Sequence, residues 1–182
     1  MKTLETERLI LRSFNENDID DFHEYCRNPN VGPNAGWEPH KDKEASLNIL
    51  KNFIEKDNVW AIEYKINNKL IGSIGLHTDE LRNIPNVRMV GYVLSEDYWG
   101  MGLMTEAVKR VIKYAFEELC LDLLSVFHYP FNIRSKHVIE KCGFKYEGTL
   151  LYSRQIYDGT IYDSACYSMT KREFEEFYGI HN

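Results

Sequence analysis

Two closely spaced glycines, Gly100 and Gly102, separate an apolar run typical of a buried strand from a pattern typical of a helix. A helix that begins directly after such a turn points its free backbone N–H groups and its positive dipole end toward one spot. Glycine has no Cβ atom to keep a phosphate away from this backbone. The segment therefore predicts a site for a cofactor that carries a pyrophosphate; on this spacing alone, a turn without a ligand is the alternative.

Two other phosphate-binding motifs fit this loop poorly. A dinucleotide-binding loop would need a third glycine at position 105, where the chain has Thr105. A Walker A loop is excluded because no Gly-Lys-Ser/Thr triplet follows the glycines.

A second pair of polar residues, Asn132 and Ser135, lies three positions apart at the start of another helical pattern, just after Tyr129 and Pro130. Asn132 is a favourable N-cap residue, which would place Ser135 at the third helical position. Residues three apart also share a helix face, so both side chains can reach a common ligand. Capping and ligand binding are therefore compatible roles for this pair.

Alternating strand and helix patterns must position these residues. The nearly unbroken apolar run 87–94 predicts a central strand, and residues 28–37 predict a loop or broken helix. Turns are expected at 67–68 and 158–159. The other predicted strands are 6–14, 59–66, 69–77, 123–127, 144–155 and 160–169, and the predicted helices are one through 19–26, 43–56, 103–119, 132–141 and a short acidic one at the end. One mixed α/β domain over residues 1–182 is expected.

Composition excludes several classes of protein. A formal charge of −6 argues against general nucleic-acid binding, which needs a basic surface. There is no apolar run long enough for a membrane span and no signal peptide, so we expect a cytoplasmic protein. The cysteines show no zinc-type spacing, and the pair His23 and Cys26 falls far short of a tetrahedral site, so we expect no metal.

Two blocks of the chain resemble a known family. Residues 98–102 (YWGMG) followed by 105–107 (TEA) look like the coenzyme A pyrophosphate loop of GCN5-related N-acetyltransferases, the GNAT superfamily. Residues 132–135 (NIRS) and 140–144 (EKCGF) are similar to the branch that contains the ribosomal-protein alanine and serine acetyltransferases. The opening residues 5–12 (ETERLILR) resemble the first strand of that branch. The resemblance covers nearly the whole chain in the same order.

The resemblance implies a single-domain GNAT fold, with a mixed, mostly antiparallel sheet flanked by helices, and acetyl-CoA as cosubstrate. It implies that the end of the central strand pairs with the pantetheine arm, as a ligand added to a sheet edge. Asn132 would bind the same arm, and Ser135 would lie near the sulfur, where it could protonate the leaving thiolate. The residues expected to bind the cofactor are Tyr92, Val93, Leu94, Gly100, Met101, Gly102, Leu103, Met104, Thr105, Asn132 and Ser135.

The implied reaction is direct attack of a neutral amine on the thioester, and here the chain departs from the family pattern. Met89 stands where many relatives have a glutamate near the acceptor amine, and Ile139 stands where many have a tyrosine acid. Met101 replaces a common lysine or arginine. The base is left open between Glu38 and His128, with His77 or a chain of water molecules as further options.

Three aromatic residues, Trp37, Tyr152 and Tyr157, are the expected walls of the acceptor pocket; ordinary packing is the alternative for each. The expected acceptor is a primary amine, either a protein N-terminus or a small molecule. An alternative function, prompted by Met89 and Ile139, is an acetyl-CoA-binding sensor or partner-binding module that has lost catalysis. A monomer or a homodimer is compatible with either function.

Overall fold

The computed structural model describes residues 1–180 of the chain. Eight strands form a mixed sheet in the order β1-β2-β3-β4-β5-β6-β8-β7. β5 and β6 run parallel, whereas β1–β2, β2–β3, β3–β4, β6–β8 and β7–β8 are antiparallel pairs. The predicted α/β fold with a mostly antiparallel sheet is confirmed, as is the central place of the strand at 87–94. The chain forms two compact units, residues 1–75 with 92–107, and residues 76–91 with the chain from Val108 onward.

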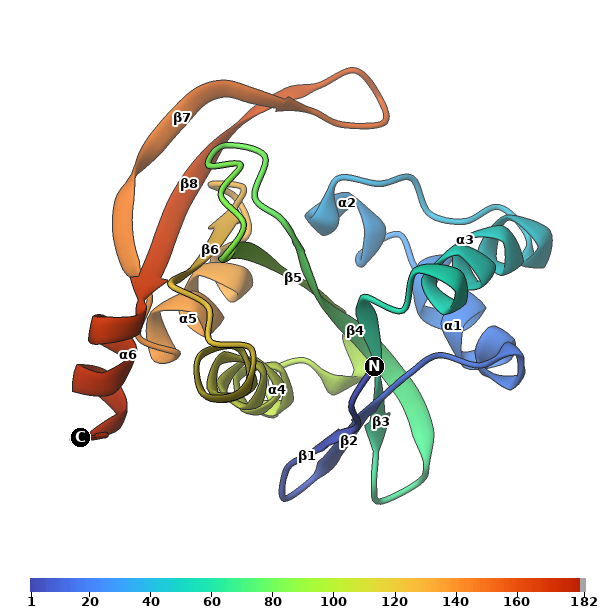
Figure 1. The fold of residues 1–182 in the computed structure, drawn as a ribbon. Helices are drawn as coiled ribbons and strands as arrows, with labels where there is room; N and C mark the ends of the chain where they lie inside the picture. The colour runs from blue at the N-terminus through green and yellow to red at the C-terminus, as the bar shows by residue number, and fades with distance from the viewer. Residues whose placement is uncertain (181–182) are drawn as a thin grey trace. The chain divides into compact units, whose positions relative to one another are not determined.

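The first unit holds the N-terminal strands and three helices. α1 and α3 pack side by side (Figure 1). Asp42 caps α3 by accepting a hydrogen bond from the backbone N–H of Ala45. The elements of this unit are β1 (Leu4–Glu5), β2 (Leu9–Arg12), η1 (Glu16–Asp18), α1 (Ile19–Cys26), α2 (Gly32–Ala35), α3 (Lys43–Lys56), β3 (Val59–Tyr64), the first residues of β4 (Lys69–Thr78), the last residues of β5 (Val87–Leu94), η2 (Glu96–Tyr98) and the start of α4 (Leu103–Lys113).

Aromatic rings form the centre of the core in this unit. Phe14, Phe22 and Phe53 contact one another with ring centroids 5.4 to 5.9 Å apart, and Leu50 is fully buried beside them. These residues come from the apolar faces of α1 and α3 and from the segment after β2. Burying each such side chain contributes about 1.5–3 kcal/mol relative to leaving it exposed.

The second unit contains the parallel strand pair and a long C-terminal hairpin, which is prominent in Figure 1. Met89 of β5 lies opposite Ser125 of β6. Parallel strands need a crossover connection, and the helical segment that follows β5 supplies it. The further elements of this unit are the rest of α4, a π-helical turn η3 (Tyr114–Glu118), β6 (Leu123–His128), α5 (Ile133–Lys141), β7 (Lys145–Gln155), β8 (Ile161–Thr170) and α6 (Lys171–Tyr178).

Most of the predicted elements are confirmed, and the differences have local causes. The predicted strand 6–14 is shorter, because residues 6–8 turn the chain between β1 and β2. The predicted helix 103–119 is α-helical only to Lys113 and then widens into the π-helical turn. The late strand at 145–155 is interrupted by two register shifts against β8, at Tyr146/Gly148 and Leu150/Arg154.

Candidate active site

The glycine loop before α4 has the backbone that its sequence predicts. Gly100 and Gly102 both have φ angles of +77°, in the left-handed region that favours glycine. α4 begins at Leu103, directly after the second glycine. A Cβ atom placed on Gly100 would meet no other atom within 4 Å, so the space beside the loop is open. The start of α4 and the open space beside Gly100 are compatible with a phosphate group, and the binding of a pyrophosphate here stays a prediction.

A partly buried ion pair between Arg8 and Glu106 connects this loop to the start of the chain. The Glu106 carboxylate accepts hydrogen bonds from Thr6 Oγ1 at 2.5 Å, from Arg8 N at 2.9 Å and from Arg8 Nε at 2.7 Å. Arg8 Nη1 also donates to the carbonyl oxygen of Met101, at 3.0 Å. Partial burial would raise the pKa of the Glu106 carboxyl, but these hydrogen bonds outweigh it and lower the pKa.

Trp99 joins the loop to the end of β5. Its indole Nε1 donates a hydrogen bond to the carbonyl oxygen of Leu94 at 2.9 Å, and its ring packs on the core of the first unit. Tyr98 packs edge-on against Tyr64, with ring centroids 5.6 Å apart. The two aromatic residues before the glycines therefore anchor the loop. The pairing of Tyr92, Val93 and Leu94 with a pantetheine arm stays a prediction.

Asn132 and Ser135 lie at the start of α5, in the second unit. The Asn132 Oδ1 atom accepts a hydrogen bond from the backbone N–H of Ser135 at 3.1 Å, which confirms the predicted N-cap. Because the donor is the backbone of Ser135, this cap does not use the Ser135 hydroxyl. The proposed roles of both residues toward a cofactor stay predictions.

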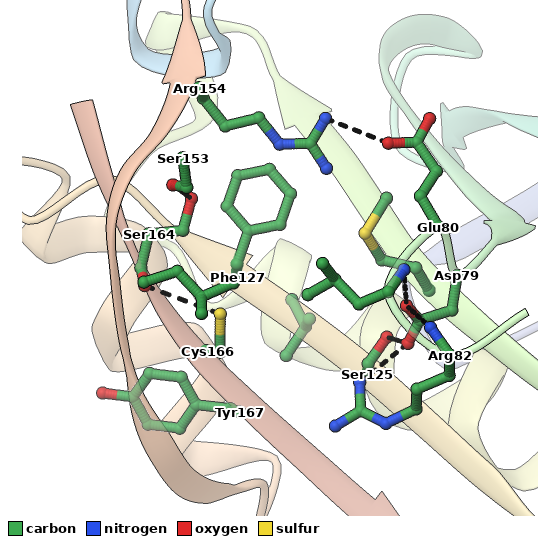
Figure 2. A pocket seen from close by; sticks show the side chains of 14 residues that line it. Asp79, Glu80, Arg82, Ser125, Phe127, Ser153, Arg154, Ser164, Cys166 and Tyr167 are labelled. Atoms are coloured by element: carbon green, nitrogen blue, oxygen red, sulfur yellow. Dashed lines mark hydrogen bonds and ion pairs between the residues drawn. The ribbon is translucent and has the colours of Figure 1, made fainter. Parts of the chain in front are cut away.

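A cavity of about 160 Å³ opens on one face of the sheet in the second unit (Figure 2). Its walls come from the connection between β4 and β5 and from strands β5, β6, β7 and β8. The lining residues are Asp79, Glu80, Leu81, Arg82, Met89, Ser125, Val126, Phe127, Leu150, Ser153, Arg154, Ser164, Cys166 and Tyr167.

Asp79 holds one side of this cavity in place. The residue is 2% exposed, and its carboxylate accepts hydrogen bonds from Ser125 Oγ at 2.6 Å, Arg82 Nη1 at 2.8 Å and Leu81 N at 2.9 Å. Burial would raise the pKa of Asp79, but the bonds from Ser125, Arg82 and Leu81 prevail and lower it. An ionised, fully bonded carboxylate is a structural anchor and a poor proton acceptor.

Arg154 lines the side of the cavity opposite Asp79. Its guanidinium lies 5.1 Å from the centroid of the Phe127 ring, and its Nη1 atom lies 3.2 Å from a carboxylate oxygen of Glu80 (Figure 2). The Glu80 side chain is 71% exposed, so this ion pair is weak. The other arginine of the cavity, Arg82, pairs with both Asp79 and Glu147. Arg154 is therefore the cation in the cavity wall whose carboxylate partner a ligand could displace.

The three residues predicted to form the acceptor pocket do not line this cavity, and their role as walls of an acceptor pocket stays a prediction. Trp37 belongs to the first unit, where it packs against Gly32 and His40. Tyr152 is 81% exposed and Tyr157 is 48% exposed, and neither lines the cavity. Tyr152 falls within the second irregularity of β7 and has a φ angle of +53°. Because a bulge redirects the side chains that follow it, strand alternation alone does not predict where Tyr152 points.

The structure shows the surroundings of Glu38 and His128, the two principal candidates for the general base. Glu38 is an exposed residue whose carboxylate lies 3.4 Å from Lys41 Nζ. His128 is buried, and its Nδ1 atom lies 2.8 Å from the carbonyl oxygen of Tyr129. Its Nε2 atom has no hydrogen-bond partner among residues 1–180. Since side chains alternate along β6, His128 faces the side of the sheet opposite to Ser125 and Phe127.

Other site classes find no support in the part of the chain that the structure describes. Those residues contain no group of three or more histidine, cysteine, aspartate or glutamate side chains arranged to hold a metal ion. Within the same range, no helix has the length and apolar character needed to cross a membrane.

Comparisons with known proteins agree with this geometry. Residues 8–145 match the family model of the acetyltransferase (GNAT) domain. The chain is 31% identical to the uncharacterized N-acetyltransferase YoaA of Bacillus subtilis (strain 168) over 92% of this chain and 96% of that protein. It is 23% identical to the [ribosomal protein uS5]-alanine N-acetyltransferase of Escherichia coli (strain K12), over 80% of this chain and 79% of that protein.

Solved structures show the same fold. A GNAT-family acetyltransferase from Bacillus anthracis superposes with a TM-score of 0.85 at 23% identity, covering 94% of this chain and 99% of that one. The microcin C7 self-immunity acetyltransferase MccE, solved in complex with acetyl-CoA and AMP, superposes with a TM-score of 0.77 at 19% identity, covering 91% of this chain and 93% of that one.

Proposed function

Because the chain belongs to the GNAT family of acetyltransferases, we propose that it transfers the acetyl group of acetyl-CoA to a primary amine by direct attack. The observation that carries this proposal is the glycine loop. Gly100 and Gly102 both adopt φ angles of +77° immediately before α4, and open space lies beside Gly100. The Arg8–Glu106 pair and the Trp99 indole hold that loop in one conformation.

Within this proposal, the backbone amides between Gly100 and Thr105 hold the pyrophosphate of acetyl-CoA. The strand end at Tyr92, Val93 and Leu94 pairs with the amides of its pantetheine arm. When bound, acetyl-CoA supplies an activated thioester. A backbone N–H at this strand end is positioned by β5 to stabilise the oxyanion that forms as the amine attacks. Ser135 provides the proton for the departing sulfur.

We assign the acceptor to the cavity of the second unit. Its volume of about 160 Å³ suits a small side chain or a short amine rather than a bulky ligand. Its lining combines apolar residues such as Met89 and Phe127 with serine hydroxyls and with Arg154, whose partner Glu80 a ligand could displace. This chemistry fits a protein N-terminus with small first residues and equally fits a small-molecule amine. Relatives that act on ribosomal proteins support the first class of acceptor.

The test is thiol release from acetyl-CoA against a panel of amines and N-terminal peptides, with acetyl-CoA binding measured in parallel by calorimetry. We expect release that depends on one class of amine and an acetylated product of the matching mass. Micromolar binding of acetyl-CoA without release for any amine would contradict the proposed transfer and favour the sensor function. Absence of binding would contradict the loop assignment itself.

A further inference from the structure

His77, near the end of β4, lies directly over Gly91 of β5. A Cβ atom placed on Gly91 would be 3.1 Å from both Cδ2 and Nε2 of the His77 ring. That separation is tighter than an ordinary van der Waals contact, so a side chain at position 91 would crowd the imidazole. The pair therefore fixes where the ring lies: on the face of β5 toward which a side chain at position 91 would point.

This is the face of the sheet that carries the cavity. Met89 and Gly91 are two residues apart on β5, so their side-chain directions coincide, and Met89 lines the cavity. Met89 is also the register partner of Ser125, another lining residue. His77 lies near the end of β4, and the cavity anchor Asp79 follows two residues later, just after the strand ends at Thr78. The imidazole thus lies on the same face of the sheet as the cavity, over the residue two positions along β5 from the lining residue Met89.

The other ionisable groups around the cavity are less able to take up a proton. Asp79 is saturated with hydrogen bonds, and Glu80 is paired with Arg154. Burial raises the pKa values of the Cys166 thiol and the Tyr167 hydroxyl, so both stay protonated near pH 7. Met89 has no basic atom. The titratable or charged residues that line the cavity are Asp79, Glu80, Arg82, Arg154, Cys166 and Tyr167.

The His77 ring, in contrast, is free to accept a proton. Among residues 1–180 it makes no hydrogen bond and no ion pair. Burial lowers its pKa from the usual 6.5, so the imidazole is neutral at pH 7 and has a free lone pair. A neutral, partly buried imidazole on the same face of the sheet as the acceptor cavity has the properties that a general base requires.

We propose that His77 is the general base that removes the proton from the acceptor ammonium group. This inference rests on the proposed acetyl transfer. One proton of R-NH3⁺ moves to the imidazole, and the freed lone pair of nitrogen forms the N–C bond to the acetyl carbon. The C–S bond then breaks, Ser135 gives its hydroxyl proton to the thiolate, and the second nitrogen proton replaces it on Ser135. The products are R-NH-acetyl, the free thiol and one proton that the imidazole returns to solvent.

The experiment replaces His77 and follows both rate and pH profile with the fastest amine of the panel. We expect His77→Gln to lower kcat at pH 7 by about 100-fold or more, the usual contribution of a general base. The KM for acetyl-CoA and the melting temperature should stay within about twofold and about 2 °C of the parent, since the ring makes no hydrogen bond or ion pair among residues 1–180 that the substitution would break. The matched control is His137→Gln, an exposed histidine on α5, which should keep the parental rate.

The pH profile separates catalysis from a structural role. In the parent, kcat/KM should rise through the lowered pKa of His77 and level off by neutral pH. In His77→Gln, only the free amine reacts, so kcat/KM should continue to rise tenfold per pH unit toward the amine's own pKa. An aromatic amine, which is already neutral at pH 7, should lose much less rate in the variant than an alkylamine does.

Two failures are distinguishable. If the parent acetylates no amine, the proposed function is refuted, and the base assignment with it. If the parent is active and His77→Gln retains its rate and its pH profile, only the assignment of His77 is wrong. A variant that loses rate equally at every pH and for both kinds of amine would also overturn the assignment, because such a loss reports altered packing.

Discussion

Gly100 combines a left-handed φ angle with an open surface. A residue with a Cβ atom at φ +77° costs about 1–3 kcal/mol in strain, and its side chain would fill the space where we place the pyrophosphate. Gly179, which ends α6, has a φ angle of +67° and equally open surroundings, yet belongs to no candidate site. A substitution at Gly179 is therefore a control for the effect of backbone strain alone.

We predict that Gly100→Val weakens acetyl-CoA binding by at least about tenfold, or about 1.4 kcal/mol, because the isopropyl group displaces the phosphate. Gly179→Val should lose a similar amount of folding stability and keep the parental affinity. Calorimetric titration with acetyl-CoA and thermal denaturation of both variants measure the two effects. Equal affinities for Gly100→Val and the parent would show that the loop does not hold the cofactor.

At the scale of the element, the loop and the start of α4 depend on a residue far away in the chain. Arg8 and Glu106 are brought together by the fold, and their contact fixes both the first turn of α4 and the carbonyl of Met101. The lowered pKa of Glu106 means that its ionised form is the one the folded state prefers. Its contribution to stability is therefore present above the unfolded pKa of about 4.5 and is lost as the pH falls through the folded value.

We predict that Glu106→Gln lowers the free energy of unfolding by about 1–3 kcal/mol at pH 7, as expected when a charged hydrogen-bond acceptor is lost. The difference from the parent should shrink as the pH falls from about 4.5 toward the lowered pKa of the folded Glu106 carboxyl, because the unfolded chain takes up the proton first. Urea denaturation at pH 7 and at pH 3.5 measures this. Glu176→Gln, which removes an exposed ion pair with Arg172, is the control and should change stability by less than about 0.5 kcal/mol. A pH-independent loss in Glu106→Gln would contradict the electrostatic explanation.

At the scale of the whole molecule, the fold divides the four cysteines into reactive and inert groups. Cys26 and Cys142 are buried, Cys166 is intermediate and Cys120 is exposed. Burial raises the pKa of the Cys142 thiol to about 12 and shifts that of Cys26 in the same direction. Since the thiolate is the reactive form, neither buried thiol should react while the protein is folded.

A thiol reagent such as dithionitrobenzoate should therefore react quickly with Cys120, slowly with Cys166, and with Cys26 and Cys142 only on unfolding. Cys120→Ser should abolish the fast phase and leave the two buried thiols unchanged. This result also sets the background for the thiol-release assay. Rapid reaction of Cys142 in the native protein would contradict the packing of α5, which buries it.

Features that depend on neighbours in the chain could be predicted from the sequence. The two left-handed glycines before a helix, the Asn132 cap on the N–H of Ser135, the boundaries of α3 and the central strand β5 are of this kind. Each is set by contacts within a few residues or by hydrophobic periodicity over one element. Both kinds of information can be read directly from the sequence.

The tertiary structure alone decided which distant side chains share a face. Examples are the cavity, the Arg8–Glu106 pair and the His77 ring over Gly91. Each brings together residues that are far apart in the sequence, and hydrophobic periodicity within one element does not predict such contacts. In a sheet, a shift of one residue in register moves every side chain to the other face. The bulges of β7 change the register twice, which brings Arg154 into the cavity wall while Tyr152 stays exposed. The sequence by itself thus determined the family, the fold and the backbone of the glycine loop, and the register of the strands determined which side chains line the cavity.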